Sequence, residues 1–206
     1  MKLNQAYYLQ DDVVFLAKDL IGKILYTQID GNKCAGIITE TEAYAGATDK
    51  ASHAYNNRRT ARTEPMFARG GIAYVYLCYG MYHLFNVVTG EEGTPHAVLI
   101  RSIVPYQGLD TMLKRRNASH YHQNLLNGPG KISIALGIHQ ACNNLSLQGN
   151  TIWIEDKHLD IDITLIKATP RIGVNYAKED ALLPYRFVLQ QKLTHEYPRL
   201  TYSTGK

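Results

Sequence analysis

A chain of 206 residues with 45% hydrophobic and 19% charged residues has a globular composition, which excludes intrinsic disorder as its main state. This length allows a substantial core, and we expect one domain over residues 1–206. The chain lacks an apolar run long enough to span a bilayer, and residues 1–5 do not lead into the apolar segment of a secretory signal. These features exclude an integral membrane protein and predict a cytoplasmic location.

The net charge of +4 is mildly basic, which permits a polyanionic partner without requiring one. Three widely spaced cysteines, Cys34, Cys78 and Cys142, suit a reducing compartment better than a disulfide framework. Fifteen tyrosines stand against four phenylalanines and one tryptophan. Such rings either pack in sheets or line half-exposed surfaces, including those on which nucleic-acid bases stack.

The first elements are a helix and a hairpin. Asp11-Asp12 offers an N-cap before apolar residues at helical spacing, and Gly22 ends the pattern, so we expect a helix of about two to three turns. Asp30-Gly31-Asn32 is a strong turn signal between two alternating segments. Residues 23–42 are therefore predicted to form a β-hairpin.

The remaining chain predicts strands with few helices. Residues 46–71 have no periodicity and form a long loop, which in a compact domain is usually functional or disordered. Strands are expected at 72–77, 84–88, 97–104, 152–155, 161–166 and 185–190, and short helices at 109–113 and from Pro129 through Leu136. Because hairpins dominate, we predict an α+β fold with a curved, mostly antiparallel β-sheet and short flanking helices.

The end of the hairpin carries the first candidate site. In a strand, Glu40, Glu42 and Tyr44 point to one face, and this face is either a solvated edge or a site that needs a carboxylate beside aromatic rings. Tyr74 and Tyr76 share a face of another predicted strand. Pairing of the two strands would give a pocket with aromatic walls and a carboxylate at its floor; the alternative is a tyrosine-rich packing face.

The turn Tyr79-Gly80-Met81-Tyr82 presents aromatic rings at a predicted hairpin tip. Exposed rigid side chains of this kind are inserted between base steps by some duplex-binding proteins, although exposed tyrosines at turns are also common. Basic residues cluster in the long loop and after a predicted helix, where they would contact phosphates or simply be solvated: Arg58, Arg59, Arg62, Lys114, Arg115 and Arg116.

A metal site has little support in the sequence. His120 and His122 would share one face if this segment were a strand, but no carboxylate or cysteine lies close in sequence. No nucleophile elbow of the G-x-S-x-G type occurs. We therefore expect neither a metal nor a cofactor.

In combination, these residues resemble the 3-methyladenine DNA glycosylases of the alkyladenine DNA glycosylase family, which excise damaged purines. The matching segments run in order along most of the chain: Glu40-Thr41-Glu42-Ala43-Tyr44, His53, Thr60-Ala61-Arg62-Thr63, Met66-Phe67, residues 74–82, Asn86, residues 97–101, Gly128-Pro129-Gly130-Lys131 and Arg171-Ile172-Gly173-Val174. The pair of segments ETEAY and YVYLCYGMY is the most specific part of the resemblance.

The resemblance implies roles for individual residues. Glu42 is similar to the base that deprotonates the attacking water, with Arg101 and a main-chain carbonyl of residues 171–174 helping to hold that water, whereas Glu40 is expected to be structural. The remaining implied roles are base-stacking walls at Tyr44, His53 and Tyr76, a wedge that fills the gap left by the base at Tyr79, exclusion of normal guanine by Asn86, and DNA contacts at Arg58, Arg59, Arg62 and Lys131.

The implied activity is that of a monofunctional glycosylase. It would flip an alkylated or deaminated purine out of duplex DNA and hydrolyse the N-glycosidic bond, acting as a monomer at the nucleoid. Two alternatives remain at this stage: a non-catalytic module that binds damaged bases, and a small-molecule-binding domain. Residues 56–59 and 82–85 depart from the family pattern, which leaves the preferred lesion open.

Overall fold

The long strand β2 (Asn32–Tyr44) lies in the middle of the sheet. In the computed structural model, which describes residues 1–193, β2 pairs with β1 and β8 on one side and with β5 on the other. The sheet order is β3-β4-β5-β2-β1-β6, with β7 beside β8. The strand bounds are β1 Ile24–Ile29, β3 Ala73–Cys78, β4 Tyr82–Thr89, β5 His96–Gln107, β6 Ile152–Glu155, β7 Ile166–Thr169 and β8 Arg186–Leu189.

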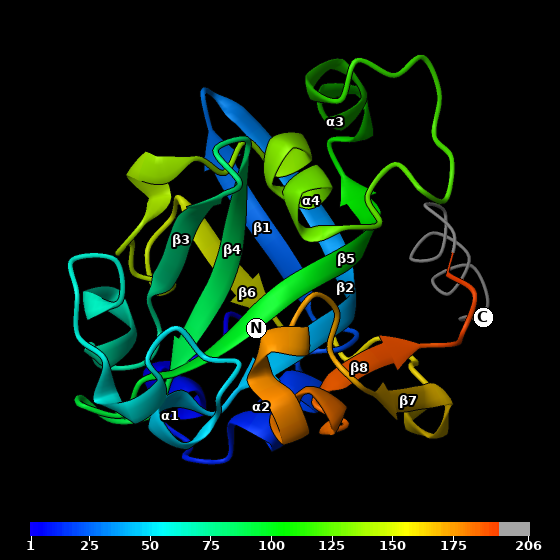
Figure 1. The fold of residues 1–206 in the computed structure, drawn as a ribbon. Helices are drawn as coiled ribbons and strands as arrows, with labels where there is room; N and C mark the ends of the chain where they lie inside the picture. Colours follow the sequence, from blue (N-terminus) through cyan, green and yellow to red (C-terminus); the bar gives the residue numbers. More distant parts are fainter. Residues whose placement is uncertain (194–206) are drawn as a thin grey trace.

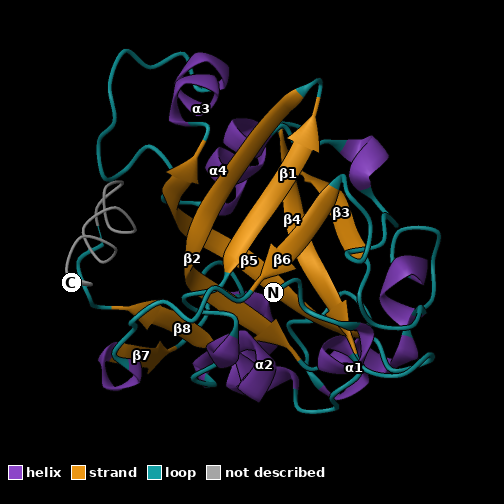
Figure 2. Cartoon of the chain, turned by 180° about the vertical axis from the view of Figure 1, so that it is seen from behind, coloured by secondary structure: helices purple, strands orange, loops and turns teal. Residues whose placement is uncertain are grey.

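All of these pairings are antiparallel, and the curved sheet with short helices confirms the predicted α+β class (Figure 1). The α-helices are α1 (Gln5–Tyr8), α2 (Val13–Asp19), α3 (Leu109–Arg115) and α4 (Pro129–Leu136). Helices α1 and α2 lie at one end of the strands and α3 at the other, while α4 packs on the face of the sheet over β4 and β5 (Figure 2). Within residues 1–193, none of the helices has the length and apolar character needed to cross a bilayer.

Local sequence explains how the helices begin and end. The Asp12 carboxylate accepts a hydrogen bond of 2.8 Å from the Phe15 amide, so it caps α2 as predicted. Helix α4 has Pro129 in its first turn, and Gly137 ends it with a φ of 77°. Sequence analysis missed α1, a single turn capped by Asn4, because four residues carry no periodic signal.

The two faces of β2 have different surroundings. The Thr41 hydroxyl donates to the Ala17 carbonyl of α2 at 2.6 Å, and Ala43 is fully buried in the main hydrophobic core. That core also contains apolar side chains of α2, α4, β1, β4 and β5. From the register irregularity at residues 38–41 onwards, Glu40, Glu42 and Tyr44 therefore face away from the core, onto the side where the candidate site lies.

Two strand boundaries differ from the predictions. Strand β5 continues through Pro105, which pairs with Gly36 at a register irregularity where the missing amide hydrogen is tolerated. A strand over 161–166 was wrong: Asp162 accepts hydrogen bonds from the amide and hydroxyl of Thr164, and this side-chain cap starts the 3₁₀ turn Ile163–Leu165. Pairing with β8 begins only at Ile166.

The predicted loop 46–71 is present and covers one face of the sheet. It contains three 3₁₀ turns: Gly46–Thr48, Tyr55–Asn57 and Glu64–Phe67. The side chains of Met66 and Phe67 are buried against Tyr74, Val88 and Ala97 in a separate hydrophobic cluster. Two further 3₁₀ segments, Gln140–Cys142 and Asn175–Leu182, complete the described helical structure. The long loop is thus attached to the sheet through apolar packing.

Candidate active site

Glu42 is a fully buried carboxylate that faces away from the hydrophobic core. Its Oε2 accepts hydrogen bonds from the Tyr44 hydroxyl at 2.8 Å and from Arg101 Nη1 at 3.2 Å, and its Oε1 accepts one from the Ile172 amide at 2.8 Å. A carboxylate has about four acceptor sites, so three fixed donors orient this group and leave one site for another donor such as water. The solvated-edge interpretation of this strand is therefore wrong.

Glu40 lies on the same face, as the alternation predicted. Arg101 joins the two carboxylates, because its Nε donates to Glu40 Oε1 at 2.9 Å while its Nη1 reaches Glu42. Glu40 Oε1 also accepts a bond of 2.6 Å from Arg186 Nε on β8, and the residue is only 6% exposed. Glu40 is thus engaged by two arginines, and its second oxygen takes no part in these bonds.

A row of paired residues explains how the face is assembled. Glu42 pairs with Leu99 on β5, Leu99 pairs with Asn86 on β4, and Asn86 pairs with Tyr74 on β3. Directly paired residues share a face of a sheet, so these side chains form one line across four strands. The direct pairing of the Glu42 and Tyr74 strands that was considered as a way to form the pocket does not occur, since β4 and β5 lie between them.

The predicted base-binding residues Tyr44, His53, Tyr76 and Asn86 meet in one small chamber of about 40 Å³. The rings of His53 and Tyr76 lie 4.8 Å apart at 75°, and those of Tyr74 and Tyr76 lie 5.2 Å apart at 36°. The Asn86 amide donates to the Tyr74 and Leu84 carbonyls at 3.1 and 3.4 Å, which fixes its orientation. The chamber therefore has aromatic walls with one oriented amide.

The chamber adjoins an open cleft of about 690 Å³. The cleft is lined by residues of the β3–β4 hairpin, the start of α4 and the 172–176 segment, together with Tyr44, His53, Arg62, Leu99, Arg101 and Arg116. Tyr79 is 88% exposed at the hairpin tip, where its φ of 50° and that of Gly80, 69°, are characteristic of a type I′ turn. The cleft thus carries an exposed aromatic side chain, held on a tight turn, at its rim.

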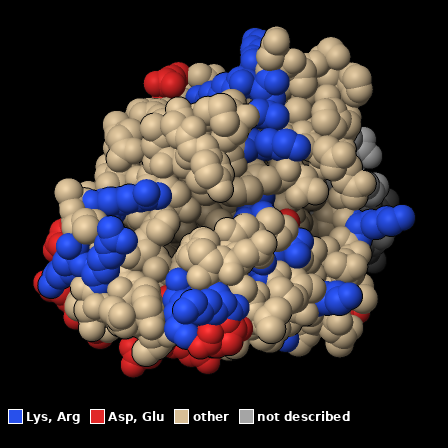
Figure 3. Space-filling model, viewed as in Figure 1, with Lys and Arg blue, Asp and Glu red and all other residues tan. Residues whose placement is uncertain are grey.

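The basic residues differ in their relation to the cleft. Arg62 lies at its wall, with Cζ 4.7 Å from the centre of the Tyr76 ring, and Lys131 lines it near the start of α4. Arg59 is not part of the lining and instead stacks on Phe67 and pairs with Glu64 at 2.9 Å. Figure 3 shows basic side chains above and beside the hollowed face, over α3 and α4 and over the 46–71 segment.

A model of the family described as Methylpurine-DNA glycosylase (MPG) matches residues 7–193 of the chain. The chain belongs to this family. It is 52% identical over 191 residues to a Chlamydia felis protein named "Putative 3-methyladenine DNA glycosylase", which covers 92% of this chain and 97% of the relative. Relatives of the same name from Chlamydia abortus and Clostridium botulinum are 51% and 46% identical, covering 92% of this chain in each case and 99% and 96% of themselves.

The protein is therefore a DNA glycosylase, a hydrolase for alkylated bases in base excision repair, and DNA is its partner. The cleft described above is lined by aromatic and basic side chains, and two of its lining residues, Tyr44 and Arg101, are hydrogen-bonded to the buried Glu42. The histidines considered as metal ligands lie elsewhere. His120 and His122 are in an irregular loop rather than a strand, and residues 1–193 contain no group of three or more potential ligands.

Some contributors to the glycosylase site were not singled out in the sequence. Tyr176 lines both the chamber and the cleft, and its hydroxyl donates to the Ala51 carbonyl at 3.0 Å. Asp49, which was also not singled out, forms a buried ion pair with Arg171, the first residue of the recognised segment 171–174. Tyr176 lies two residues after the recognised segment ending at Val174, which was an available signal, whereas no local pattern pointed to Asp49.

His53 contributes a pH-sensitive element to the chamber of the glycosylase. Its Nδ1 lies 2.9 Å from the Tyr74 hydroxyl. Burial of the imidazole, followed by the nearby positive charges of Arg62 and Arg58, lowers the pKa of His53 from 6.5 to about 4. The ring is therefore neutral at pH 7 and can accept or donate a hydrogen bond according to its tautomer.

This lowered pKa predicts a specific pH dependence of folding. Because the unfolded chain binds the His53 proton first, the stability contribution is complete above pH 6.5 and is lost as pH falls towards 4. We expect a loss of about 2 to 3 kcal/mol at pH 4. Urea unfolding measures the free energy of unfolding at each pH between 7 and 4. This free energy should change less with pH for His53→Gln than for the wild type, and an equal change in both proteins would contradict the prediction.

Proposed function

We propose that this glycosylase rotates a damaged purine, alkylated or deaminated, out of duplex DNA and hydrolyses its N-glycosidic bond with a water activated by Glu42. The observation that carries the proposal is the buried Glu42 carboxylate held by three donors beside a chamber of aromatic side chains. The link between the two is Tyr44, which lines the chamber and donates its hydroxyl hydrogen to Glu42.

The chemical step follows from the charge of the lesion. A purine methylated at N3 or N7 is cationic, so the bond between the sugar and the base breaks with its electron pair going to the purine, which leaves neutral. A deaminated purine is neutral, so it must also take up a proton from solvent water as it leaves. The water oxygen forms a bond to the sugar carbon, and Glu42 accepts the proton of that water. The same carboxylate stabilises the positive charge that develops on the sugar. Arg101, 3.2 Å from Glu42, keeps the carboxylate in place.

Base selection would depend on the chamber walls. Tyr44, His53 and Tyr76 offer ring faces and edges to a flipped base, and tyrosine faces attract a cationic ring more strongly than a neutral one. Asn86 is held by two carbonyls and would stand against the exocyclic amino group of guanine. Flipping costs least for a damaged pair, which adds to the discrimination.

The surface around the cleft would hold the duplex. Tyr79 at the turn would fill the space left by the base, because its ring is exposed and its backbone lies in a tight turn. Arg62 and Lys131 at the cleft, and Arg58 and Arg59 farther out, would contact phosphates. We also propose that the enzyme acts as a monomer on nucleoid DNA.

Incubation of the protein with duplexes that carry one hypoxanthine or one ethenoadenine, and with methylated DNA, tests the proposal. We expect strand breaks only after alkali treatment and no protein–DNA adduct after borohydride, because the proposed nucleophile is water. Damage-specific binding without alkali-labile sites would indicate a non-catalytic module. Breaks without alkali together with a trapped adduct would indicate an amine nucleophile and would contradict the water mechanism.

A further inference from the structure

Asp49 and Arg171 form an ion pair behind the proposed active site. The side chain of Arg171 is 0% exposed and that of Asp49 is 1% exposed. Both guanidinium nitrogens Nη1 and Nη2 donate to the two carboxylate oxygens, the latter at 2.8 Å. Neither residue lines the chamber or the cleft, and the pair contacts the site through β2, Tyr44 and the Ile172 segment.

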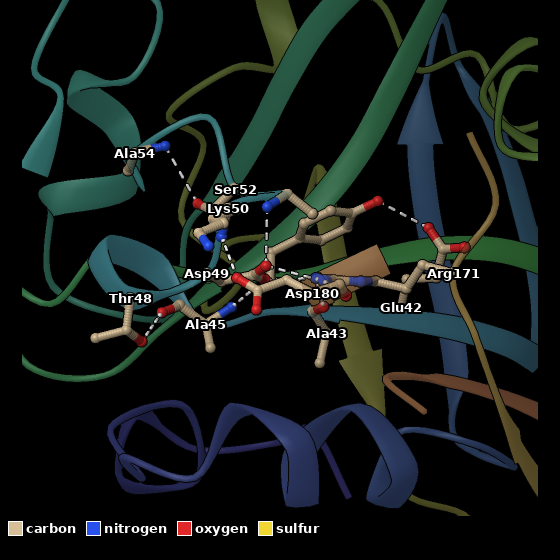
Figure 4. Close-up of polar contacts among 12 residues, drawn as sticks. Glu42, Ala43, Ala45, Thr48, Asp49, Lys50, Ser52, Ala54, Arg171 and Asp180 are labelled. Atoms are coloured by element: carbon tan, nitrogen blue, oxygen red, sulfur yellow. Dashed lines mark hydrogen bonds and ion pairs between the residues drawn. The ribbon is translucent and has the colours of Figure 1, made fainter. Parts of the chain in front are cut away.

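The pair joins the end of β2 and the 45–51 segment that follows it to the distant 171–180 segment (Figure 4). Arg171 donates to the Ala43 carbonyl on β2 at 2.8 Å and to the Asp180 carbonyl at 3.1 Å. Asp49 accepts from the amides of Ala45 and Ala51 at 3.0 and 2.9 Å. The end of β2, the 45–51 segment and the 171–180 segment are therefore held in one arrangement.

The ion pair also contacts the backbone and side chains around Glu42 and Tyr44, the residues proposed to activate water and to stack on the base. Ala43 lies between Glu42 and Tyr44, so its carbonyl bond to Arg171 fixes the backbone of both. The amide that follows Arg171, that of Ile172, is the donor to Glu42 Oε1. Arg171 Cζ also lies 4.9 Å from the centre of the Tyr44 ring, supporting that ring from its rear.

A buried ion pair is a costly way to gain stability, because desolvation of the two charges offsets much of their attraction. Geometry explains why an ion pair is present here. The planar guanidinium of Arg171 donates hydrogen bonds to a carboxylate and to two carbonyls and also contacts an aromatic ring. We propose that the Asp49–Arg171 pair is a positioning device that sets Glu42 and Tyr44 for the chemical step. This inference rests on the proposed function.

The test compares the wild type with Asp49→Asn/Arg171→Gln, which removes both charges together and leaves no unpaired buried charge. Small displacements of a reacting group have large rate effects. We therefore expect the single-turnover excision rate to fall about 10- to 100-fold while the Kd for DNA with an abasic site stays within about threefold. Arg171→Lys keeps the charge but not the planar fork, and its rate should lie between those of the wild type and the double variant.

Lys23→Gln is the matched control. Lys23 pairs with Asp19 at 2.7 Å, its side chain is 11% exposed, and it lies outside the site. The Lys23→Gln variant should have a lower melting temperature than the wild type but the same excision rate when folded. A double variant with lower stability but a wild-type rate would overturn the positioning role, provided that Glu42→Gln is inactive. Absence of excision by the wild type would instead reject the proposed function.

Discussion

Replacement of Glu42 by glutamine is expected to reduce the single-turnover excision rate about 10²- to 10⁴-fold, which is the contribution of a general base. The amide cannot accept the water proton. It also places an NH₂ group against one of the donors Tyr44, Arg101 or Ile172, which should lower the stability by about 1 to 3 kcal/mol. Excision assays on the duplex that the wild type cleaves, together with urea unfolding, measure both effects.

Glu40→Gln provides the control for this substitution. Arg101 and Arg186 both donate to Oε1 of Glu40, so a glutamine oxygen can keep both bonds. We expect this variant to be folded and active. The opposite pattern, with Glu40→Gln inactive and Glu42→Gln active, would transfer the proposed role to Glu40.

The second large effect is expected for Tyr79→Asn. The ring is 88% exposed, so little packing is lost, and Asn-Gly is the preferred pair for a type I′ turn. The free energy of unfolding should be unchanged or higher by up to about 1 kcal/mol, because asparagine tolerates the left-handed conformation better than tyrosine does. Loss of one aromatic contact with the stacked bases, about 1 to 3 kcal/mol, should slow excision from duplex DNA about 10- to 100-fold.

The lesion context separates this wedge role from a general loss of activity. A damaged base in a mismatched pair is already poorly stacked, so its excision should depend less on Tyr79 than excision from a matched pair does. Tyr79→Trp, which keeps a flat ring at the tip, should remain active. An equal loss on matched and mismatched duplexes, or no loss on either, would contradict the wedge.

Local patterns were sufficient for several elements of this fold. The turn residues Asp30-Gly31-Asn32 correctly predicted the β1–β2 hairpin, and the aspartate before Val13 correctly predicted the N-cap of α2. Period-two alternation placed Glu40 and Glu42 on one face, which Arg101 now confirms by bonding to both. These features depend on residues within a few positions of one another, where backbone geometry dominates.

Other features depended on pairings that no local pattern encodes. Alternation could not tell whether the Glu42 strand lay at an edge of the sheet or in its centre, because the backbone partners come from β5 and β8. For the same reason, alternation could not show that β4 and β5 separate the Glu42 strand from the Tyr74 strand. The strand predicted over 161–166 failed for another reason, since a side-chain cap at Asp162 competed with the extended backbone.

The sequence by itself determined the family resemblance, the α+β class, the shared face of the two glutamates and the aromatic turn at Tyr79. Only the tertiary structure decided that Glu42 is buried among three donors, that four strands carry one row of side chains to the chamber, and that Asp49 meets Arg171 across 122 residues of chain. The physical reason is that burial and ion pairing are properties of segments brought together by folding.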